Sequence, residues 1–275
     1  MTALGVAGAA SAGRWRRWVM IGMVWAYAGL LVGAPVAALL AGALRDGLGA
    51  LLAALSRPAV AAAFALTAQI AGLVVVVHGV FGTLVAWVLV RHRFTGRAWV
   101  NALIDLPFAV SAVVVGYMLL LIFGRTGLLG PMLAQWGLKV AFSTPGMVLA
   151  TLFVTLPFMI RQLMPVMEAF GPEQGQAAAT LGASEWQTFW WVTFPALRWG
   201  FVYGLGLTLA RALGEFGAVL VIGGGIQGRT DTATIYIYHA LEERQYVGAY
   251  GAALALGLVS LGLMTAIGYV RRRVK

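Results

Sequence analysis

Six long apolar segments constrain this chain more than any other feature of its sequence. They cover about residues 19–44, 60–90, 99–123, 142–167, 199–222 and 246–270. An α-helix rises about 1.5 Å per residue and the hydrocarbon core of a bilayer is roughly 30 Å thick, so about 20 apolar residues cross it. Because hydrocarbon cannot satisfy exposed backbone groups, each segment must be helical. The sequence therefore predicts an all-α membrane protein with six transmembrane helices.

The composition agrees with this prediction and excludes other classes. Of 275 residues, 61% are hydrophobic and 10% are charged, whereas a soluble domain is about half apolar and a quarter charged. The chain has no cysteine, which excludes disulfides and thiolate sites. Its three histidines are isolated, so we expect no bound metal. No basic stripe interleaves with aromatic residues, so we expect no nucleic-acid partner.

Basic residues are distributed unevenly between the two sets of loops. The N-terminal tail, residues 91–97, residues 161–198 and the C-terminal tail contain twelve Lys and Arg residues, against six in the opposite loops. Such clusters are retained in the cytoplasm. We therefore expect both termini inside: a tail over 1–18, one transmembrane domain over 19–270 and a basic tail over 271–275. The first span is too long for a signal peptide core of about 7–15 residues, so we expect it to be retained.

The polar connection over residues 161–198 has a helix–break–helix pattern. Residues 176–181 are mostly good helix formers. Gly182 is suited to end that helix in a left-handed conformation. Ser184 and Gln187 have the spacing of a capping box, which predicts that a second short helix starts there.

The second short helix is rich in aromatic residues and needs a partner. These residues are Trp186, Phe189, Trp190 and Trp191. We expect Pro195 to end the helix, because proline lacks an amide donor. So short a helix is not stable alone. Its aromatic face fits either a groove on a partner protein or the lipid headgroup zone.

The spacing in this connection resembles the loop by which permeases of ATP-binding-cassette (ABC) importers dock on their ATPase. That loop reads Glu-Ala-Ala, three residues, Gly, nine residues, Ile-x-Leu-Pro, and this chain has the same spacing with Gln, Val and Phe at three of the positions. The resemblance implies the following ATPase-docking residues: Gln176, Ala177, Ala178, Gly182, Ser184, Trp186, Phe189, Val192 and Pro195.

Segments 106–111, 149–158 and 210–219 resemble sulfate/thiosulfate importer permeases, particularly their W-type subunit, and molybdate permeases share Arg-Ala-Leu-Gly-Glu-Phe-Gly. The resemblance implies a type I ABC importer permease (MetI-like) fold in the bacterial inner membrane. It implies a second permease subunit, related or identical, two ABC ATPase subunits that use ATP and Mg²⁺, and a periplasmic oxyanion-binding protein. The cargo would be sulfate or thiosulfate, or alternatively molybdate or tungstate. With no phosphate-binding loop, we expect this chain to be no enzyme and to bind no cofactor.

Several polar residues lie within the predicted spans. Arg211 and Glu215 are four residues apart and share a helical face, so we expect an ion pair. The pair is either structural or lines the translocation pathway, where Arg211 attracts an oxyanion and Glu215 holds it in place. Ser111 and Thr155 can bind the cargo or their own backbone. For His78 we expect a hydrogen bond between helices.

Two segments near span ends have more than one interpretation. Asp105 is expected in the first turns of the third span, where it complements the helix dipole or belongs to a gate hinge at Pro107. Residues 223–244 begin with a formal Gly-x-Gly-x-x-Gly pattern, but a dinucleotide site needs a preceding strand. We expect a flexible outer loop there, which serves as a re-entrant gate or as a contact for a binding protein.

Two other functional classes make different predictions. An ATP-independent secondary anion transporter needs proton-relay carboxylates or paired broken helices. The spans contain one acid well inside the membrane, Glu215, and this class leaves the docking-loop pattern unexplained. An intramembrane enzyme needs a nucleophile with a base, and His78 has no evident partner in the sequence.

Overall fold

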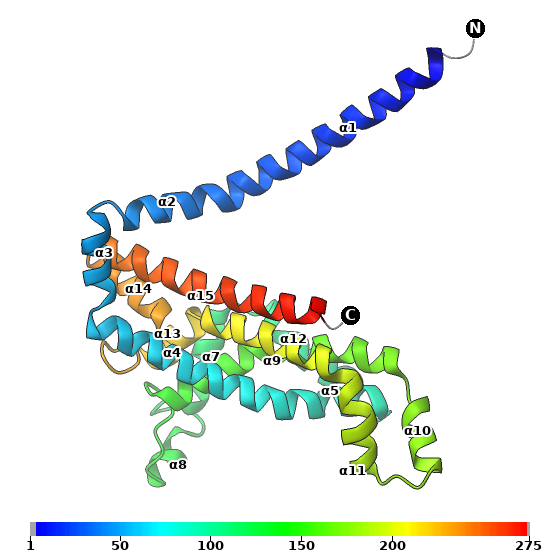
Figure 1. Ribbon diagram of the computed structural model, residues 1–275. Coiled ribbons are helices and arrows are strands. Elements are labelled where there is room, and N and C mark those ends of the chain that lie inside the picture. Colours follow the sequence, from blue (N-terminus) through cyan, green and yellow to red (C-terminus); the bar gives the residue numbers. More distant parts are fainter. Residues whose placement is uncertain (1–3, 274–275) are drawn as a thin grey trace.

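The computed structural model describes residues 4–273, with side chains for residues 15–269. All regular elements in this part of the chain are helices (Figure 1). The longer ones are α1 (Leu4–Ala28), α2 (Ala34–Ala43), α3 (Gly47–Leu55), α4 (Pro58–Val77), α5 (Thr83–Arg91), α6 (Arg97–Ala109), α7 (Ala112–Phe123), α9 (Thr144–Phe170), α12 (Phe194–Leu213), α14 (Ala233–Glu242) and α15 (Tyr246–Arg273). The shorter ones are α8 (Gly130–Gln135), α10 (Glu173–Thr180), α11 (Glu185–Thr188) and α13 (Gly217–Gly223), with the π-helical turns η1 (Gly29–Gly33), η2 (His78–Gly82) and η3 (Phe189–Thr193).

Four of the six predicted spans are long helices in the structure. They run over Trp15–Ala43, Pro58–Arg91, Thr144–Phe170 and Tyr246–Tyr269. The π turns η1 and η2 lie inside the first two without ending them. The fold is therefore all-α with four continuous candidate spans, or six when each bent helix pair is counted as one.

The third and fifth predicted spans are each formed by two helices that meet at a bend, a feature that the apolar segments alone did not predict. Helices α6 and α7 meet at 117°, and the helix formed by α11, η3 and α12 meets α13 at 57°. Pro107 lies inside α6 and removes one amide donor, and Ser111 has an extended backbone before α7. Gly214 and Phe216 leave the helical conformation at the second break.

Helix α9 forms the centre of the bundle. It contacts α4, α5, α6, α7, α12 and α13, and 61% of its most apolar window is buried, against none in the first span. Large buried side chains such as Met159, Ile160 and Leu163 point from it into the core. The first span instead extends away from the bundle and touches it through the packing of α2 on α15 (Figure 1).

Residues 223–244 are not a flexible loop, which corrects the prediction. They contain α14, with Ala233, Ile235 and Ala240 buried against the bundle. The hydroxyl of Thr67 in α4 accepts a hydrogen bond of 2.8 Å from the amide of Ala233. The segment therefore contains a helix with an apolar face, and this face packs against α4 and α15.

The two ends of the bundle differ. Helices α10 and α11 project at the end where α15 finishes, and α3 and α8 lie at the opposite end, together with the connection between α14 and α15 (Figure 1). We call α10, the turn that follows it, α11 and η3 the hairpin, with α10 as its first arm and α11 with η3 as its second arm. The hairpin end carries the residues with the docking-loop spacing.

Candidate functional site

The turn of the hairpin has the predicted glycine break. Gly182 has φ of +87°, in the left-handed region that favours glycine. Its amide donates to the carbonyl of Ala179 (3.0 Å), and the amide of Ala183 donates to the carbonyl of Ala178 (3.1 Å). These bonds satisfy carbonyls at the end of α10. The turn is thereby fixed by backbone hydrogen bonds.

The predicted capping box is also present. Ser184 Oγ accepts a hydrogen bond from the amide of Gln187 (3.3 Å), and Gln187 Oε1 accepts one from the amide of Ser184 (2.8 Å). The box satisfies two amides at the start of α11. It fixes the angle at which the second arm of the hairpin leaves the turn.

The second arm continues into α12, part of the fifth predicted span, and the prediction that Pro195 ends it is wrong. Glu185–Leu213 is one helix, with η3 and Pro195 inside it. Pro195 occupies the first turn of α12. Just before it, the amide of Phe194 bonds to the carbonyl of Phe189, five residues back. A π turn of this kind changes the hydrogen-bond pattern locally, so a proline fits without ending the helix.

The aromatic residues of the hairpin divide into two groups. Phe189 is half-buried and packs edge-to-face on Trp87 of α5, with ring centroids 6.2 Å apart. Trp186 and Trp191 are 70% and 81% exposed. Leu181 at the turn, which the sequence pattern did not single out, is 89% exposed. Phe189 therefore fixes the hairpin to the bundle, and the other three present apolar surface outward.

The remaining predicted docking residues lie around this surface. Gln176, Ala177, Gly182, Ser184 and Pro195 are exposed, whereas Ala178 and Val192 are half-buried.

Arg91 ties the first arm of the hairpin to α5. It donates to the carbonyl of Gly171, just before α10, and its guanidinium lies 5.4 Å from the ring centroid of Trp87. Arg91 entered the sequence analysis only as a topogenic charge. Its second role depends on a contact between segments 80 residues apart, for which a single sequence carries no signal.

The predicted ion pair forms at the second break. Arg211 Nη1 lies 2.7 Å from Glu215 Oε2, and the side chains are 32% and 2% exposed. Glu215 Oε1 also accepts a hydrogen bond from the amide of Ala218 (3.1 Å), and its backbone carbonyl accepts one from Thr234 of α14 (2.7 Å). One carboxylate thus neutralises a membrane arginine and stabilises the start of α13.

The two breaks lie against each other. A side chain added at Gly217, two residues after Glu215, would meet the backbone amide of Val113 at 3.2 Å and Cβ of Ala112 at 3.4 Å. These residues begin α7, directly after exposed Ser111. Irregular backbone at membrane depth is tolerated only where protein buries it or a water-filled cavity adjoins it. The structure thus places Ser111 and the Arg211–Glu215 pair at one irregular region.

Thr155 is in a different environment. It is fully buried in α9, where its hydroxyl donates to the carbonyl of Thr151 (2.7 Å) and lies 3.0 Å from His78 Nε2. His78 Nε2 is also 3.1 Å from the carbonyl of Leu152. The expected hydrogen bond between helices through His78 is confirmed, and Thr155 is its partner.

A second ion pair joins α6 to α9. Arg161 Nε and Nη2 lie 2.7 and 2.6 Å from the two carboxylate oxygens of Asp105, and Nη1 bonds to the side chain of Asn101 (3.1 Å). Asp105 lies in α6, which forms the first half of the bent third span. A carboxylate there meets the arginine fork of α9 rather than a helix N-terminus.

Comparison with known proteins defines the class of this molecule. The model of the family described as binding-protein-dependent transport system inner membrane component matches residues 78–275. The chain belongs to this family. The resemblance to ABC importer permeases that the sequence motifs indicated is confirmed.

Curated relatives and a solved structure narrow the comparison. The chain is 42% identical over 245 residues to the sulfate transport system permease protein CysW of Synechocystis, covering 89% of each chain. It is 42% identical over 247 residues to the protein of that name from Escherichia coli K12, covering 90% of this chain and 85% of the relative. A chain of a bacterial alginate ABC transporter, solved with an alginate-pentasaccharide-bound periplasmic protein, matches with TM-score 0.78 at 19% identity, covering 94% of this chain and 95% of that one. The fold is that of ABC importer permeases.

Proposed function

We propose that this chain is a permease subunit of an ATP-driven, binding-protein-dependent importer that carries sulfate or thiosulfate across the bacterial inner membrane. The observation that carries the proposal is the 42% identity to sulfate transport permeases along 89% of this chain and of its Synechocystis relative. Because the match extends over nearly the whole of both chains, the matched region contains the two breaks and the hairpin.

The chain works with partners in this proposal. A second permease subunit completes the pathway, ABC ATPases bind ATP and Mg²⁺ and hydrolyse the nucleotide, and a periplasmic protein delivers the anion. Both termini and the hairpin face the cytoplasm, as the distribution of Lys and Arg indicates. The periplasmic protein bound to the alginate transporter supports the last partner by analogy.

The hairpin is the place where the ATPase acts. Leu181, Trp186 and Trp191 are exposed apolar residues at its tip and second arm, and aromatic anchors of this kind fill grooves on partner proteins. The second arm and α12 form one helix over Glu185–Leu213, about 43 Å long at about 1.5 Å per residue. Movement of the ATPase is therefore transmitted along this helix to the break at Glu215.

The anion passes the irregular region formed by the two breaks. Arg211 keeps about a third of its side chain exposed there, and its charge attracts an oxyanion. Glu215 holds the guanidinium in place, and exposed Ser111 offers a hydroxyl to the passing anion. Thr155 is fully buried and bonds to His78 inside the bundle.

The transport proposal is tested by reconstitution. Vesicles that contain this chain, its partner permease and the ATPase, supplied with the binding protein, are expected to take up radiolabelled sulfate only when ATP is present. Competition by unlabelled thiosulfate, molybdate and tungstate ranks the anions. Uptake driven by a proton gradient without ATP would show a secondary transporter and overturn the proposal.

The docking role is tested with two matched glycine variants. Gly182→Glu introduces a charged side chain at the hairpin turn, and Gly137→Glu does so beyond α8 at the opposite end of the bundle. Both glycines have positive φ, +87° and +70°, and open space around them, so the backbone strain is similar. We expect only Gly182→Glu to release the ATPase in co-purification. Equal retention of the ATPase by both variants would contradict the assignment.

A further inference from the structure

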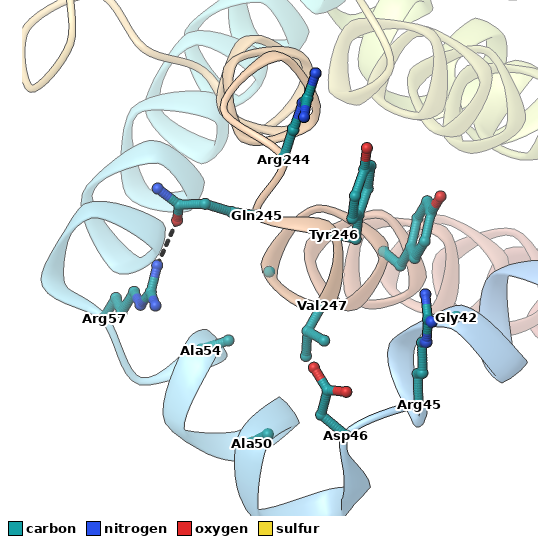
Figure 2. Close-up of a pocket in the computed structure, with 12 residues that line it drawn as sticks. Gly42, Arg45, Asp46, Ala50, Ala54, Arg57, Arg244, Gln245, Tyr246 and Val247 are labelled. Atoms are coloured by element: carbon teal, nitrogen blue, oxygen red, sulfur yellow. Dashed lines mark hydrogen bonds between the residues drawn. The ribbon is translucent and has the colours of Figure 1, made fainter.

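A cavity of about 850 Å³ lies at the end of the bundle opposite the hairpin. It is bordered by the α2–α3 turn, the end of α3 and the start of α15. Figure 2 shows Arg45 and Asp46 on one side of this hollow, Arg57 on another, and Arg244 with Tyr246 at the connection between α14 and α15. These residues line one hollow although their segments lie about 200 residues apart in the chain.

The lining of this cavity carries excess positive charge. Three arginines, Arg45, Arg57 and Arg244, stand against one acid, Asp46. Arg57 donates a hydrogen bond to Gln245 Oε1, which leaves its charge uncompensated. Within the residues that the structure describes, neither Arg45 nor Arg244 has a salt-bridge partner. An anion is the ligand that such a lining favours.

The backbone at Arg244 gives a second, independent observation. Arg244 has φ of +59°, in the left-handed region, and directly follows Glu243 at the end of α14. Its amide donates to the carbonyl of Leu241 and the amide of Gln245 donates to that of Ala240. Glycine is the usual residue at this position of a helix end. An arginine there accepts backbone strain, and its side chain lines the cavity.

The cavity opens at the level expected for lipid headgroups. Helix α3 lies across the end of the bundle (Figure 1), and its Leu48 and Leu52 are 66% and 62% exposed. Tyr246 and Tyr250, with ring centroids 6.1 Å apart, lie at the start of the last span. Tyrosines at a span end mark the interface between hydrocarbon and headgroups.

We propose that this cavity binds a tetrahedral oxyanion, with the phosphodiester of an anionic membrane lipid as the source that its position favours. Arginine forks match phosphate oxygens in pairs. Asp46 and Gln245 then accept hydrogen bonds from hydroxyl groups of a glycerol headgroup. Free sulfate has the same tetrahedral oxyanion chemistry. The site is far from the hairpin and does not depend on which anion the chain transports.

The test measures lipid binding by the delipidated full-length chain. Native mass spectrometry after addition of phosphatidylglycerol or phosphatidylcholine is expected to show preferential retention of phosphatidylglycerol. A second arm adds sodium sulfate without lipid and follows the thermal unfolding midpoint. Stabilisation by phosphatidylglycerol alone identifies the lipid as the source, and stabilisation by sulfate as well identifies a site open to soluble anions.

Variants locate the binding in this cavity. Arg244→Gly relieves the backbone and removes one guanidinium, and Arg45→Gln removes another. We expect binding to weaken about fivefold for each arginine removed. Arg229→Gln, at an exposed arginine outside the cavity lining, is the control and should bind as the natural chain does. Equal retention by all variants, or no preference between the two lipids and no effect of sulfate, would overturn the proposal. The proposal would also be overturned if the arginine variants bound lipid normally but no longer took up anion delivered by the binding protein. The arginines would then contact that protein.

Discussion

Two ion pairs of the same chemistry occupy different environments in this molecule. Arg211 and Glu215 lie 2.7 Å apart across the break between α12 and α13, and Glu215 is 2% exposed. Arg161 and Asp105 lie 2.6 Å apart between α9 and α6, and their side chains are 33% and 49% exposed. The first pair is local in sequence and buried on one side. The second joins residues 56 positions apart in a half-exposed position.

The difference in burial decides what each pair does. Removal of one partner from a buried pair leaves an uncompensated charge at high cost, whereas exposed pairs contribute little because water screens them. Glu215 also caps α13 through Ala218, so it maintains the irregular backbone itself. Arg161 instead links two complete helices with a fork of hydrogen bonds. We therefore expect the Arg211–Glu215 pair to contribute to the stability of the folded chain. We expect the Arg161–Asp105 pair to fix the position of α6 relative to α9.

The largest expected effect follows from Glu215→Ala. This change leaves Arg211 without its partner and the amide of Ala218 without its acceptor. We expect a loss of about 3 kcal/mol, the lower part of the range for a broken buried pair, visible as a lower thermal midpoint in detergent and less folded protein.

Glu215→Gln is the matched control for this prediction. It retains an acceptor for Ala218 but removes the charge, so its midpoint should lie between those of the other two proteins. If Glu215→Ala were as stable as the natural chain, the carboxylate would not hold the break together.

A smaller effect is expected at the Arg161–Asp105 pair. A double-mutant cycle with Arg161→Ala and Asp105→Ala should give a coupling energy of about 1 kcal/mol, at the upper end for exposed pairs because the contact is bidentate. Arg161→Lys keeps the charge and loses the fork, so it should retain less than half of this coupling. A coupling of zero would mean that the contact is incidental.

Salt should separate the two pairs further. At 1 M salt the screening length falls to about 3 Å, so the midpoint difference between the natural chain and Asp105→Ala should shrink. The difference for Glu215→Ala should persist, because its carboxylate is buried. A similar decrease in both differences would contradict the contrast between the pairs.

The same contrast explains how much of the molecule the sequence predicts. The Arg211–Glu215 pair, the Gly182 turn and the Ser184 capping box depend on neighbours within four residues, and all three were predicted. The Arg161–Asp105 pair depends on how α6 packs on α9, which no local pattern encodes. The six spans were likewise predicted from the apolar composition and length of their segments, because the bilayer fixes both.

The wrong predictions concern continuity of helices. Pro195 was expected to end a helix and instead lies inside one, since the preceding π turn accommodates it. In the third span, where the sequence offered a hinge at Pro107 as one interpretation, the helix breaks a few residues after that proline. The presence of a proline therefore does not show whether a helix ends, bends or continues at that point. The outcome depends on the hydrogen bonds of the preceding turn and on the packing of neighbouring helices. Helix α14 was missed because the glycine-rich stretch over residues 223–228, which precedes it, indicated a loop.

A third pair, Asp231 and His239 beside α14, extends the comparison with the smallest expected effect. The side chains are 13% and 19% exposed, with 3.2 Å between His239 Nδ1 and Asp231 Oδ1. Burial raises the pKa of the Asp231 carboxyl above its usual 3.8, and the attraction of His239 opposes this with a weaker effect. An acid with a raised pKa in the folded state contributes stability below its unfolded pKa of about 3.9 and loses that contribution as pH rises through the folded value. Asp231→Asn cannot ionise, so its thermal midpoint should increase relative to the natural chain between about pH 4 and about pH 7. If the natural chain gained stability over the variant in this range, the attraction of His239 would exceed the cost of burial, and this pair would resemble Arg211–Glu215 rather than a partly compensated charge.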